Sequence, residues 1–298
     1  MTQPLPRRLV THNGSAHADE VVATALVLAL DHRVERIERK PEPNAAELVD
    51  PDCYVLDFGR RHEPALLNFD HHQFAPDEAP RCTITLILEH AGLLEQARTF
   101  WPSLPRVELY DVRGPDAVAL AYGLSGGNAV EHFQSPVEEA VRSAFSQVQE
   151  LNRGDALFTA LALIGQSLVE DLRAGVATLA WLREHAMVRP LAPGVNLLWF
   201  EDRPSAGPEV YNHAFDVFRA GLEAEVRLVV VPDSRGAGWQ MRRLSGWDGA
   251  DFRRVAGSPL LKFIHVSGFL ATTYSREPRE RVEALIREAL VDRPGGSP

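Results

Sequence analysis

The feature that most constrains the fold is a pair of short predicted strands, each ending in a chemically reactive side chain. Residues 8–12 end in His12, and the apolar run at 53–57 ends in Asp57. A continuous apolar run of this length is typical of a parallel strand that is covered on both faces. Between them, 18–30 has the length and Ala/Leu content of a helix. Strand, helix and strand at this spacing predict an α/β fold with right-handed crossovers.

The rest of the chain predicts a helical middle region followed by a second α/β unit. Strands predominate only beyond Pro190, so we predict an N-terminal domain at 1–125, a helical connector at 126–190 and a smaller C-terminal domain at 191–298. A turn cluster at 125–128 precedes a helix start at Ser135-Pro136. Further strands are predicted at 34–37, 195–200, 226–231, 239–243 and 263–266, and helices at 83–94, 107–124, 137–151, 156–185, 208–222 and 278–291.

Composition and charge exclude several classes of protein. The 298 residues are 45% hydrophobic, enough to form a core, and no apolar run approaches the roughly 18 residues of a membrane span. The N-terminus has no signal-peptide core, and only two cysteines occur, so we expect a cytosolic protein. The net charge of −10 argues against broad, charge-driven coating of nucleic acid, but not against a local grip on its end.

Three segments carry potential chemistry, each at or just after a predicted strand. The segment 12–20 holds two histidines and two acids around a turn, where His12, His17 and Asp19 can converge. The second segment, 56–59, contributes one acid, and the third, 68–73, holds two adjacent histidines that must point in different directions. Ligands of open α/β sheets collect at the carboxyl ends of the strands. We therefore expect these three segments to form one site.

The residue types in these segments are those of a metal site. Imidazole nitrogens with carboxylate oxygens suit Mn²⁺, Mg²⁺, Zn²⁺ or Fe²⁺ better than metals that prefer thiolates. Several carboxylates are available to bridge, which indicates two cations about 3.5–4 Å apart, as used for phosphoryl displacement. The alternative is that the histidines and acids cap helices and neutralise one another. Three such clusters in the first 75 residues favour the metal site over this alternative.

These motifs resemble the MYG exonuclease family, which is related to the Asp-His-His (DHH) phosphoesterases. The resemblance rests on H-N-G-x-x-H-x-D-E at 12–20, V-L-D-F-G at 55–59 and F-D-H-H-Q at 69–73. Near the C-terminus, I-H-V-S-G-F at 264–269, with Arg276 and Glu277 beyond it, is similar to a further segment of the family.

The resemblance implies a two-domain, DHH-phosphoesterase-like α/β fold. Its N-terminal metal-binding domain has a mostly parallel sheet flanked by helices. Its smaller C-terminal domain has a mixed sheet and binds substrate at a cleft between the domains. The implied activity is metal-dependent phosphodiester hydrolysis, acting as a 3′-to-5′ exonuclease on RNA.

The family's roles transfer to single positions of this chain. Asp57 would be the carboxylate that bridges two cations, Mn²⁺ foremost, and His72 would face the scissile phosphate, so these two are the expected catalytic residues. Asp70 would orient His71 from behind. The full expected metal set is His12, His17, Asp19, Asp57, His71 and Asp111, and the expected substrate-binding residues are His265, Gly268 and Arg276.

Two departures from the family pattern matter. The family shows two acids three apart followed by Asn-Gly, whereas here an extra residue separates Asp111 from Gly114, so Asp116 is the fallback ligand. The C-terminal Gly-Gly of the family is replaced by Ala271-Thr272, and a backbone without glycine approaches a phosphate less easily.

The residues themselves support a mechanism and leave alternatives open. A water shared by two cations bridged by Asp57 would be acidified, His72 could donate a proton, and Arg276 or Arg279 could hold the neighbouring phosphate. A small-molecule nucleotide or pyrophosphate phosphoesterase would use the same metals. A non-hydrolytic RNA- or nucleotide-binding protein and a metal-dependent deacetylase or amidase are further alternatives. The oligomeric state stays open, a homodimer included.

Overall fold

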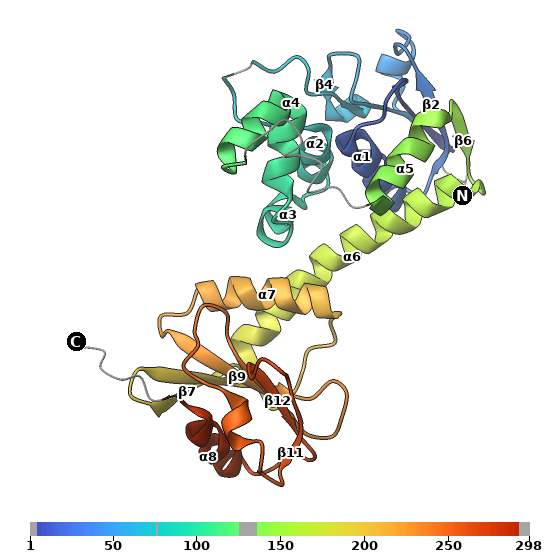
Figure 1. The fold of residues 1–298 in the computed structure, drawn as a ribbon. Helices are drawn as coiled ribbons and strands as arrows, with labels where there is room; N and C mark the ends of the chain where they lie inside the picture. Colours follow the sequence, from blue (N-terminus) through green and yellow to red (C-terminus); the bar gives the residue numbers. More distant parts are fainter. Residues whose placement is uncertain (1–4, 76, 125–135, 292–298) are drawn as a thin grey trace. The chain divides into compact units, whose positions relative to one another are not determined.

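The computed structural model describes residues 5–75, 77–124 and 136–291 (Figure 1). The chain forms two compact units, Met1–Ala174 and Gly175–Pro298, and helix α6 (Ala156–His185) contains the point of division. The predicted domain limits at 125 and 190 stay predictions. The turn cluster predicted at 125–128 and the helix start predicted at Ser135 lie outside the described residues.

Unit 1 is built on a six-stranded sheet, sheet A, that is mostly parallel, as predicted. The strand order is β4-β5-β3-β1-β2-β6. The central strand β1 pairs in parallel with β2 and β3, and β3 pairs in parallel with β5, whereas β4 and β6 run antiparallel at the two edges. The strands are β1 Arg7–His12, β2 Val34–Lys40, β3 Cys53–Leu56, β4 His62–Glu63, β5 Asn68–Phe69 and β6 Glu150–Asn152.

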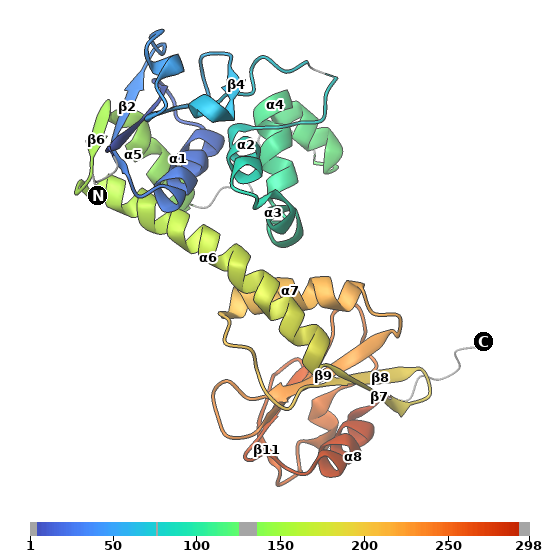
Figure 2. The same cartoon turned by 180° about the vertical axis from the view of Figure 1, so that it is seen from behind.

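Apolar burial at the centre of sheet A explains why these segments form strands. Leu9, Val10, Val55 and Leu56 are all fully buried, as expected of parallel strands with both faces covered. The helices of unit 1 are α1 Ala18–Leu30, α2 Thr83–His90, α3 Leu94–Phe100, α4 Leu104–Ala121, α5 Pro136–Gln147 and the first part of α6, with short 3₁₀ turns at Glu47–Val49 and Pro64–Leu66 (Figure 2).

A glycine lets α6 approach α1 closely. A Cβ atom placed on Gly165 would lie 1.8 Å from the carbonyl oxygen of Ala25, so any larger residue would push the two helices apart. Because α1 begins directly after the histidine-containing loop, this contact helps to hold that loop against the sheet.

The register of sheet A places three functional side chains at one edge. Thr11 is aligned with Leu56, and Leu56 is aligned with Phe69, on three strands that run in the same direction. The next residue of each strand is therefore at the same level, and these residues are His12, Asp57 and Asp70.

Unit 2 holds a second six-stranded sheet, sheet B, which is mixed as predicted. Its order is β11-β12-β10-β9-β8-β7, and only β8 and β9 are parallel neighbours. Helix α8 packs on one face over the main core cluster, and α7 lies over the other face (Figures 1 and 2). The elements are β7 Met187–Ala192, β8 Val195–Trp199, α7 Pro208–Ala220, β9 Val226–Pro232, β10 Trp239–Arg243, a 3₁₀ turn at Phe252–Val255, β11 Leu261–Ile264, β12 Leu270–Thr273 and α8 Arg279–Ala289.

The α/β class is confirmed, and the differences from the predicted elements have local causes. The helix predicted at 83–94 divides into α2 and α3 because Gly92 adopts a left-handed conformation, with φ 68°. The helix predicted at 137–151 ends at Gln147, since 150–152 joins the edge of sheet A as β6. Strand β7 was missed because Arg189 and Pro190 interrupt its apolar pattern, and Pro is tolerated there because β7 is an edge strand.

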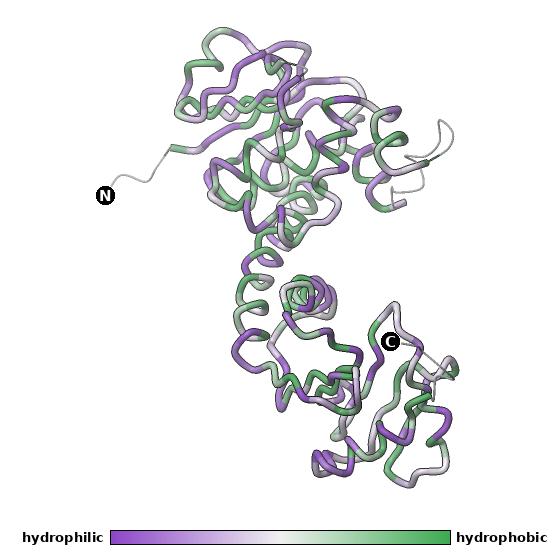
Figure 3. The backbone as a smooth tube through the Cα atoms, turned by 90° about the vertical axis from the view of Figure 1, so that its left-hand side faces the viewer, coloured by the Kyte–Doolittle hydropathy of each residue, from purple (hydrophilic) through white to green (hydrophobic). Residues whose placement is uncertain are grey.

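Hydropathy follows this architecture. Figure 3 shows apolar and polar stretches alternating along both units, the pattern of elements that bury one side. Within the described ranges, no helix is both long enough and apolar enough to span a membrane.

Candidate metal centre

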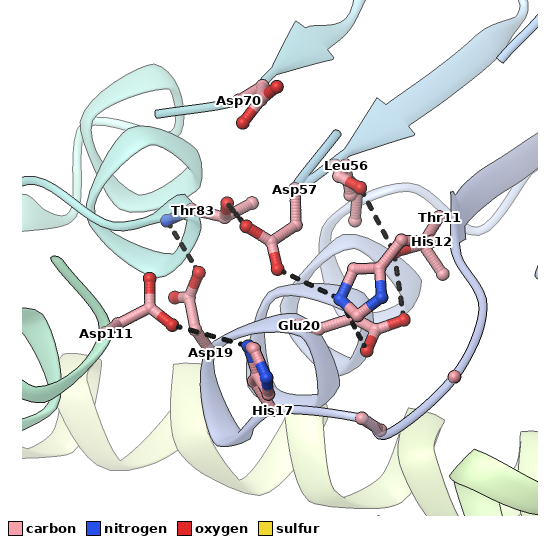
Figure 4. Close-up of polar contacts among 12 residues, drawn as sticks. Thr11, His12, His17, Asp19, Glu20, Leu56, Asp57, Asp70, Thr83 and Asp111 are labelled. Carbon is pink, nitrogen blue, oxygen red and sulfur yellow. Dashed lines mark hydrogen bonds and ion pairs between the residues drawn. The ribbon is translucent and has the colours of Figure 1, made fainter. Parts of the chain in front are cut away.

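Asp57 occupies the middle of the site in a left-handed backbone conformation. Its φ is 60°, which few residues other than Gly adopt, although Asp and Asn tolerate it better than most. The backbone is held there because its amide donates to the carbonyl of Phe69 at 3.0 Å, and the hydroxyl of Thr83 donates to Oδ1 at 3.1 Å (Figure 4). The turn directs the Asp57 carboxylate toward the carboxyl edge of sheet A. A strained backbone conformation of this kind is typical of functional residues.

One set of donors lies on the β1 side of Asp57. His12 Nε2 is 3.4 Å from Asp57 Oδ2, and the His12 and His17 rings are 5.6 Å apart. His12, His17 and Asp57 each offer a ligand atom within 4.8 Å of the others. His12 Nδ1 is 2.8 Å from the carbonyl of Asn13, an acceptor that places the ring proton on Nδ1 and leaves Nε2 to bind a cation.

A second set lies on the other side of Asp57. Asp19, Asp57, His71 and Asp111 again offer ligand atoms within 4.8 Å of one another. His71 Nε2 lies 3.1 Å from Asp57 Oδ1 and 2.9 Å from Asp111 Oδ2, yet that buried Asp111 oxygen has no hydrogen-bond partner among the described residues. The nitrogen and the oxygens thus face a common space, which is the arrangement of ligands around a cation.

Asp57 belongs to both sets, and also to a third group of possible ligands with Asp70, His71 and His72. This is the geometry expected of a carboxylate that bridges two cations. The six residues proposed as metal ligands from the sequence therefore converge on one site, and His17 Nδ1 at 3.9 Å from Asp111 Oδ1 connects the two sets. The donors fit two divalent cations by type and by number, and the buried Asp111 Oδ2 faces the same space as His71 Nε2, 2.9 Å away.

Protonation neutralises the acids where no cation is bound. Burial by itself lowers the pKa of His12, but the contacts with Asp57 and Glu20 outweigh it and raise the pKa to about 9. In the same way, contacts with Asp111 and Asp57 overcome burial and raise the pKa of His71 to about 10. Burial raises the pKa of Asp57, but its two histidine contacts win and the net pKa is lowered. The two imidazoliums thus occupy the place of positive charge that cations would take.

Asp19 is held by the start of α2. Its carboxylate accepts hydrogen bonds from the backbone amides of Thr83 and Ile84, each at 2.8 Å. A helix N-terminus stabilises negative charge through its free amides and its dipole. Complete burial, together with the charges of Asp111 and Asp57, nevertheless raises the pKa of Asp19 well above its usual value. A cation at this site would offset that cost.

Sequence reasoning did not assign a role to Glu20 or Arg39, which form a buried ion pair behind His12. Arg39 Nε and Nη2 donate to the Glu20 carboxylate at 3.1 and 3.2 Å, and Glu20 Oε2 is 3.2 Å from His12 Nε2. Arg39 Nη1 also donates to the carbonyls of Gly14 and Phe145. A signal for this pair existed, because an acid within an otherwise apolar helix must be buried and needs a counter-charge.

A second network is centred on the buried Glu108, which lies in the same helix as Asp111. The Thr85 hydroxyl donates to Glu108 at 2.5 Å, and Arg98 donates to both oxygens of Glu108 at 3.1 and 3.3 Å. These bonds join α2, α3 and α4. Since Glu108 precedes Asp111 by about one turn of α4, the network sets the direction in which Asp111 points.

The break in α4 explains why Asp111 rather than Asp116 joins the cluster. Gly114 has φ 78° and ψ 177°, outside helical geometry, and Pro115 follows it. Asp116 therefore lies in the second part of α4, where it is exposed, whereas Asp111 lies in the first part.

Asp70 contacts His72, whereas the family pattern predicts that Asp70 orients His71. Its Oδ1 is 2.6 Å from His72 Nδ1 and accepts from the His72 amide at 3.1 Å. The His72 ring lies 4.3 Å from the His71 ring, and its side chain is 53% exposed. The contact with Asp70 is the main cause that raises the pKa of His72.

In unit 2 the three predicted substrate-binding residues have different surroundings. His265 Nδ1 is 2.7 Å from the Ser267 hydroxyl, and His265 lines a cavity on the α7 side of sheet B. Gly268 has φ 70°, and a Cβ atom there would lie 2.0 Å from Asp251, so the backbone requires glycine. Arg276 stacks on Trp239, 5.2 Å from the ring centre, which belongs to the core on the α8 side.

The sequence comparisons with known proteins concern unit 1. The family model of the MYG1 exonucleases, described as an uncharacterised protein family, matches residues 8–94. A MYG1 protein of Chlamydia trachomatis is 41% identical over 70 residues, 23% of this chain and 23% of that protein. The MYG1 exonuclease of Rattus norvegicus is 39% identical over 69 residues, 23% of this chain and 17% of that protein. The aligned segment thus spans less than a quarter of these relatives.

Solved structures were compared over 95% of the chain. RecJ of Thermus thermophilus, solved in complex with Mn²⁺, is 18% identical with a TM-score of 0.31, and the match covers 52% of that chain. The DHH domain of a member of the s1p family of ribosomal proteins is 13% identical with a TM-score of 0.34, over 86% of that chain. The resemblance inferred from the three motifs is confirmed by the sequence comparisons for residues 8–94, a segment that matches the MYG1 exonuclease family.

Proposed function

We propose that this protein is a metal-dependent phosphodiester hydrolase, a 3′-to-5′ exonuclease that acts on RNA or short oligonucleotides. The observation that carries the proposal is the position of Asp57, which belongs to both sets of converging donors. A carboxylate shared between two cation sites is suited to the two-metal hydrolysis of phosphate esters. The match of residues 8–94 to the MYG1 exonuclease family supports the same reaction class.

Each ligand residue has a defined place in this scheme. His12 and His17 would hold one cation together with Asp57, and Asp19, His71 and Asp111 would hold the other, again with Asp57. The hard oxygen and imidazole donors suit Mn²⁺, with Mg²⁺ as the alternative. When bound, the two cations supply an acidified water and neutralise charge on the phosphoryl oxygens.

His72 is the proposed proton donor to the phosphate or the leaving oxygen. Asp70 engages Nδ1, so Nε2 is free to face substrate from a half-exposed ring. The contact with Asp70 raises the pKa of His72 and so favours the protonated imidazole, the state that a general acid requires.

We assign the substrate-binding role of unit 2 to His265 and Gly268. Arg276 stacks on Trp239 on the α8 side of sheet B, so its predicted phosphate contact would lie on a different face from that of His265. Both cysteines, Cys53 and Cys82, are free and buried, as expected of the reducing cytoplasm where we place the protein.

The test compares 5′-labelled RNA, DNA and small phosphodiesters in the presence of Mn²⁺. Products shortened one nucleotide at a time are expected with RNA, and EDTA should abolish them. Asp57→Asn should reduce turnover at least 100-fold, because an amide lacks the charge that holds two cations together. Asp116→Asn, the same change at an exposed acid of α4, should leave turnover within twofold.

Other outcomes identify other functions. Hydrolysis of small phosphodiesters without shortening of oligonucleotides would indicate a small-molecule phosphoesterase. Binding of RNA with Mn²⁺ but without turnover would indicate a binding protein. Full activity of metal-saturated Asp57→Asn would refute the two-cation scheme.

A further inference from the structure

We propose that the α7 face of sheet B binds single-stranded oligonucleotide along two adjoining cavities, so that unit 2 grips two successive nucleotides rather than one phosphate. This inference rests on the proposed function and specifies its substrate as a polymer. It also assigns the contacts to residues outside the motifs discussed above.

Two cavities lie side by side under α7. The first has a volume of about 750 Å³ and the second about 580 Å³, and Asn212 and Arg242 line both. Each lies within the range of roughly 300–1,000 Å³ that is typical of sites for small organic ligands. We call the pair the α7 groove. Its two halves are large enough for one nucleotide each, and Arg242 lies at the junction, where the phosphate that links two nucleotides would be.

The α7 groove carries a positive charge on a chain whose net charge is −10. Six basic residues line it against two acids, Asp233 and Asp216. Asp233 is already 4.0 Å from Lys262. The basic residues are Arg203, Arg235, Arg242 and Lys262 in the first cavity, with Arg219 and Arg243 joining Arg242 in the second.

Several of these arginines have no acidic partner. In the part of the chain that the structure describes, Arg203, Arg219 and Arg242 form no ion pair, whereas arginines elsewhere, such as Arg189 and Arg253, do. Burial lowers the pKa of Arg203 more than Tyr211 and Asp233 raise it, and the charge of Arg242 also lowers it. Like charges this close in a half-buried groove are relieved when an anion binds between them.

Aromatic side chains line the same two cavities. Tyr211 and the 51% exposed Phe263 belong to the first cavity, and Phe269 and the half-buried Trp247 belong to the second. Nucleobases stack on aromatic rings irrespective of sequence, and arginines hold the phosphates between them. A single small phosphorylated compound would use one cavity and leave the other without a role, so the two halves favour a single strand.

Binding is measured on the full-length protein in EDTA, which prevents hydrolysis. Unlabelled mono-, di- and tetranucleotides compete with a labelled single-stranded octanucleotide, as RNA and as DNA of the same sequence. Trp247→Ala should reduce affinity for the tetranucleotide about tenfold, the effect of losing one stacked base, and for the mononucleotide less than twofold. Because Trp247 also packs against the core, Trp247→Phe is the variant that keeps a ring and should retain most of the affinity.

Arg219→Ala tests the electrostatic part. Losing one phosphate contact should reduce the slope of log affinity against log salt by about 0.7 for a single strand, whereas Trp247→Ala should leave the slope unchanged. The matched control is Arg281→Ala on α8, an exposed arginine of the same unit on the opposite face, which should change neither quantity.

Several results would overturn the inference. They are equal losses for mononucleotide and tetranucleotide in Trp247→Ala, an unchanged salt slope in Arg219→Ala, or equal affinity of mono- and tetranucleotides for the unmodified protein. Equal competition by RNA and DNA would indicate that the groove contacts stacked bases and phosphates. A preference for RNA would indicate further contacts to the 2′-hydroxyl. Either result supports the binding of a single strand. If the protein binds oligonucleotides with the expected length dependence but does not hydrolyse them in Mn²⁺, the proposed activity is refuted and the inference about the α7 groove is not. If it hydrolyses them but binds them without length dependence, the inference about the α7 groove is refuted and the proposed activity is not.

Discussion

Replacing Arg39 by Met should destabilise unit 1, although Arg39 is not one of the proposed cation ligands. The guanidinium is 1% exposed and makes two hydrogen bonds to Glu20 and two to backbone carbonyls. It also lies 4.7 Å from the centre of the Phe145 ring. Met fills a similar volume but leaves the Glu20 carboxylate buried without its partner.

The size of the loss follows from these contacts. Breaking a buried ion pair by removing one partner costs about 3–5 kcal/mol, since the remaining charge is desolvated. His12 is 3.2 Å from Glu20 and, with a pKa of about 9, stays positive near pH 7, so we expect the lower end of this range. For a unit of this size, about 3 kcal/mol corresponds to a fall in Tm of roughly 6–12 °C.

Calorimetry of the full chain with and without Mn²⁺ measures this loss. The matched control is Arg36→Met on the same strand, because Arg36 pairs with Glu150 at 2.8 Å with both side chains more than 40% exposed. An exposed pair of this kind contributes about 0–1 kcal/mol. If Arg39→Met lowers Tm no more than Arg36→Met does, the Glu20–Arg39 pair does not support the site and the reasoning is wrong.

Three further predictions concern the site and unit 2. Asp70→Asn should lower the pKa of His72 and shift the alkaline limb of the rate profile to lower pH without changing Mn²⁺ content, as measured by kcat against pH and metal analysis. Without metal, the raised pKa values of His12 and His71 give a stabilisation that is fully present below pH 6.5 and is lost as the pH rises through about 9 and about 10. The Tm measured in EDTA should therefore fall as the pH rises through these values, and added Mn²⁺ should reverse the fall. Arg276→Ala should raise KM about tenfold or more if Arg276 contacts phosphate, and a change under twofold would indicate that its role is to stack on Trp239.

Local sequence patterns determined much of unit 1. The apolar runs before His12 and Asp57 specify strands that must be buried, and polar residues at their carboxyl ends must then meet at one edge of a parallel sheet. The motif at 69–73 placed Asp70 and His71 at the end of the next strand along that edge. These inferences needed only the hydrophobic periodicity of the sequence and the shared direction of parallel strands.

Only the tertiary structure decided which distant residues complete the site. The choice between Asp111 and Asp116 depends on the break of α4 at Gly114, which has no periodic signature in the sequence, and Arg39 meets Glu20 because β2 lies beside β1 in sheet A. In unit 2, the same sheet separates Arg276 on the α8 side from His265 on the α7 side. Periodicity states which face of an element is buried, but the partner across that face depends on strand order and register, which long-range packing alone sets.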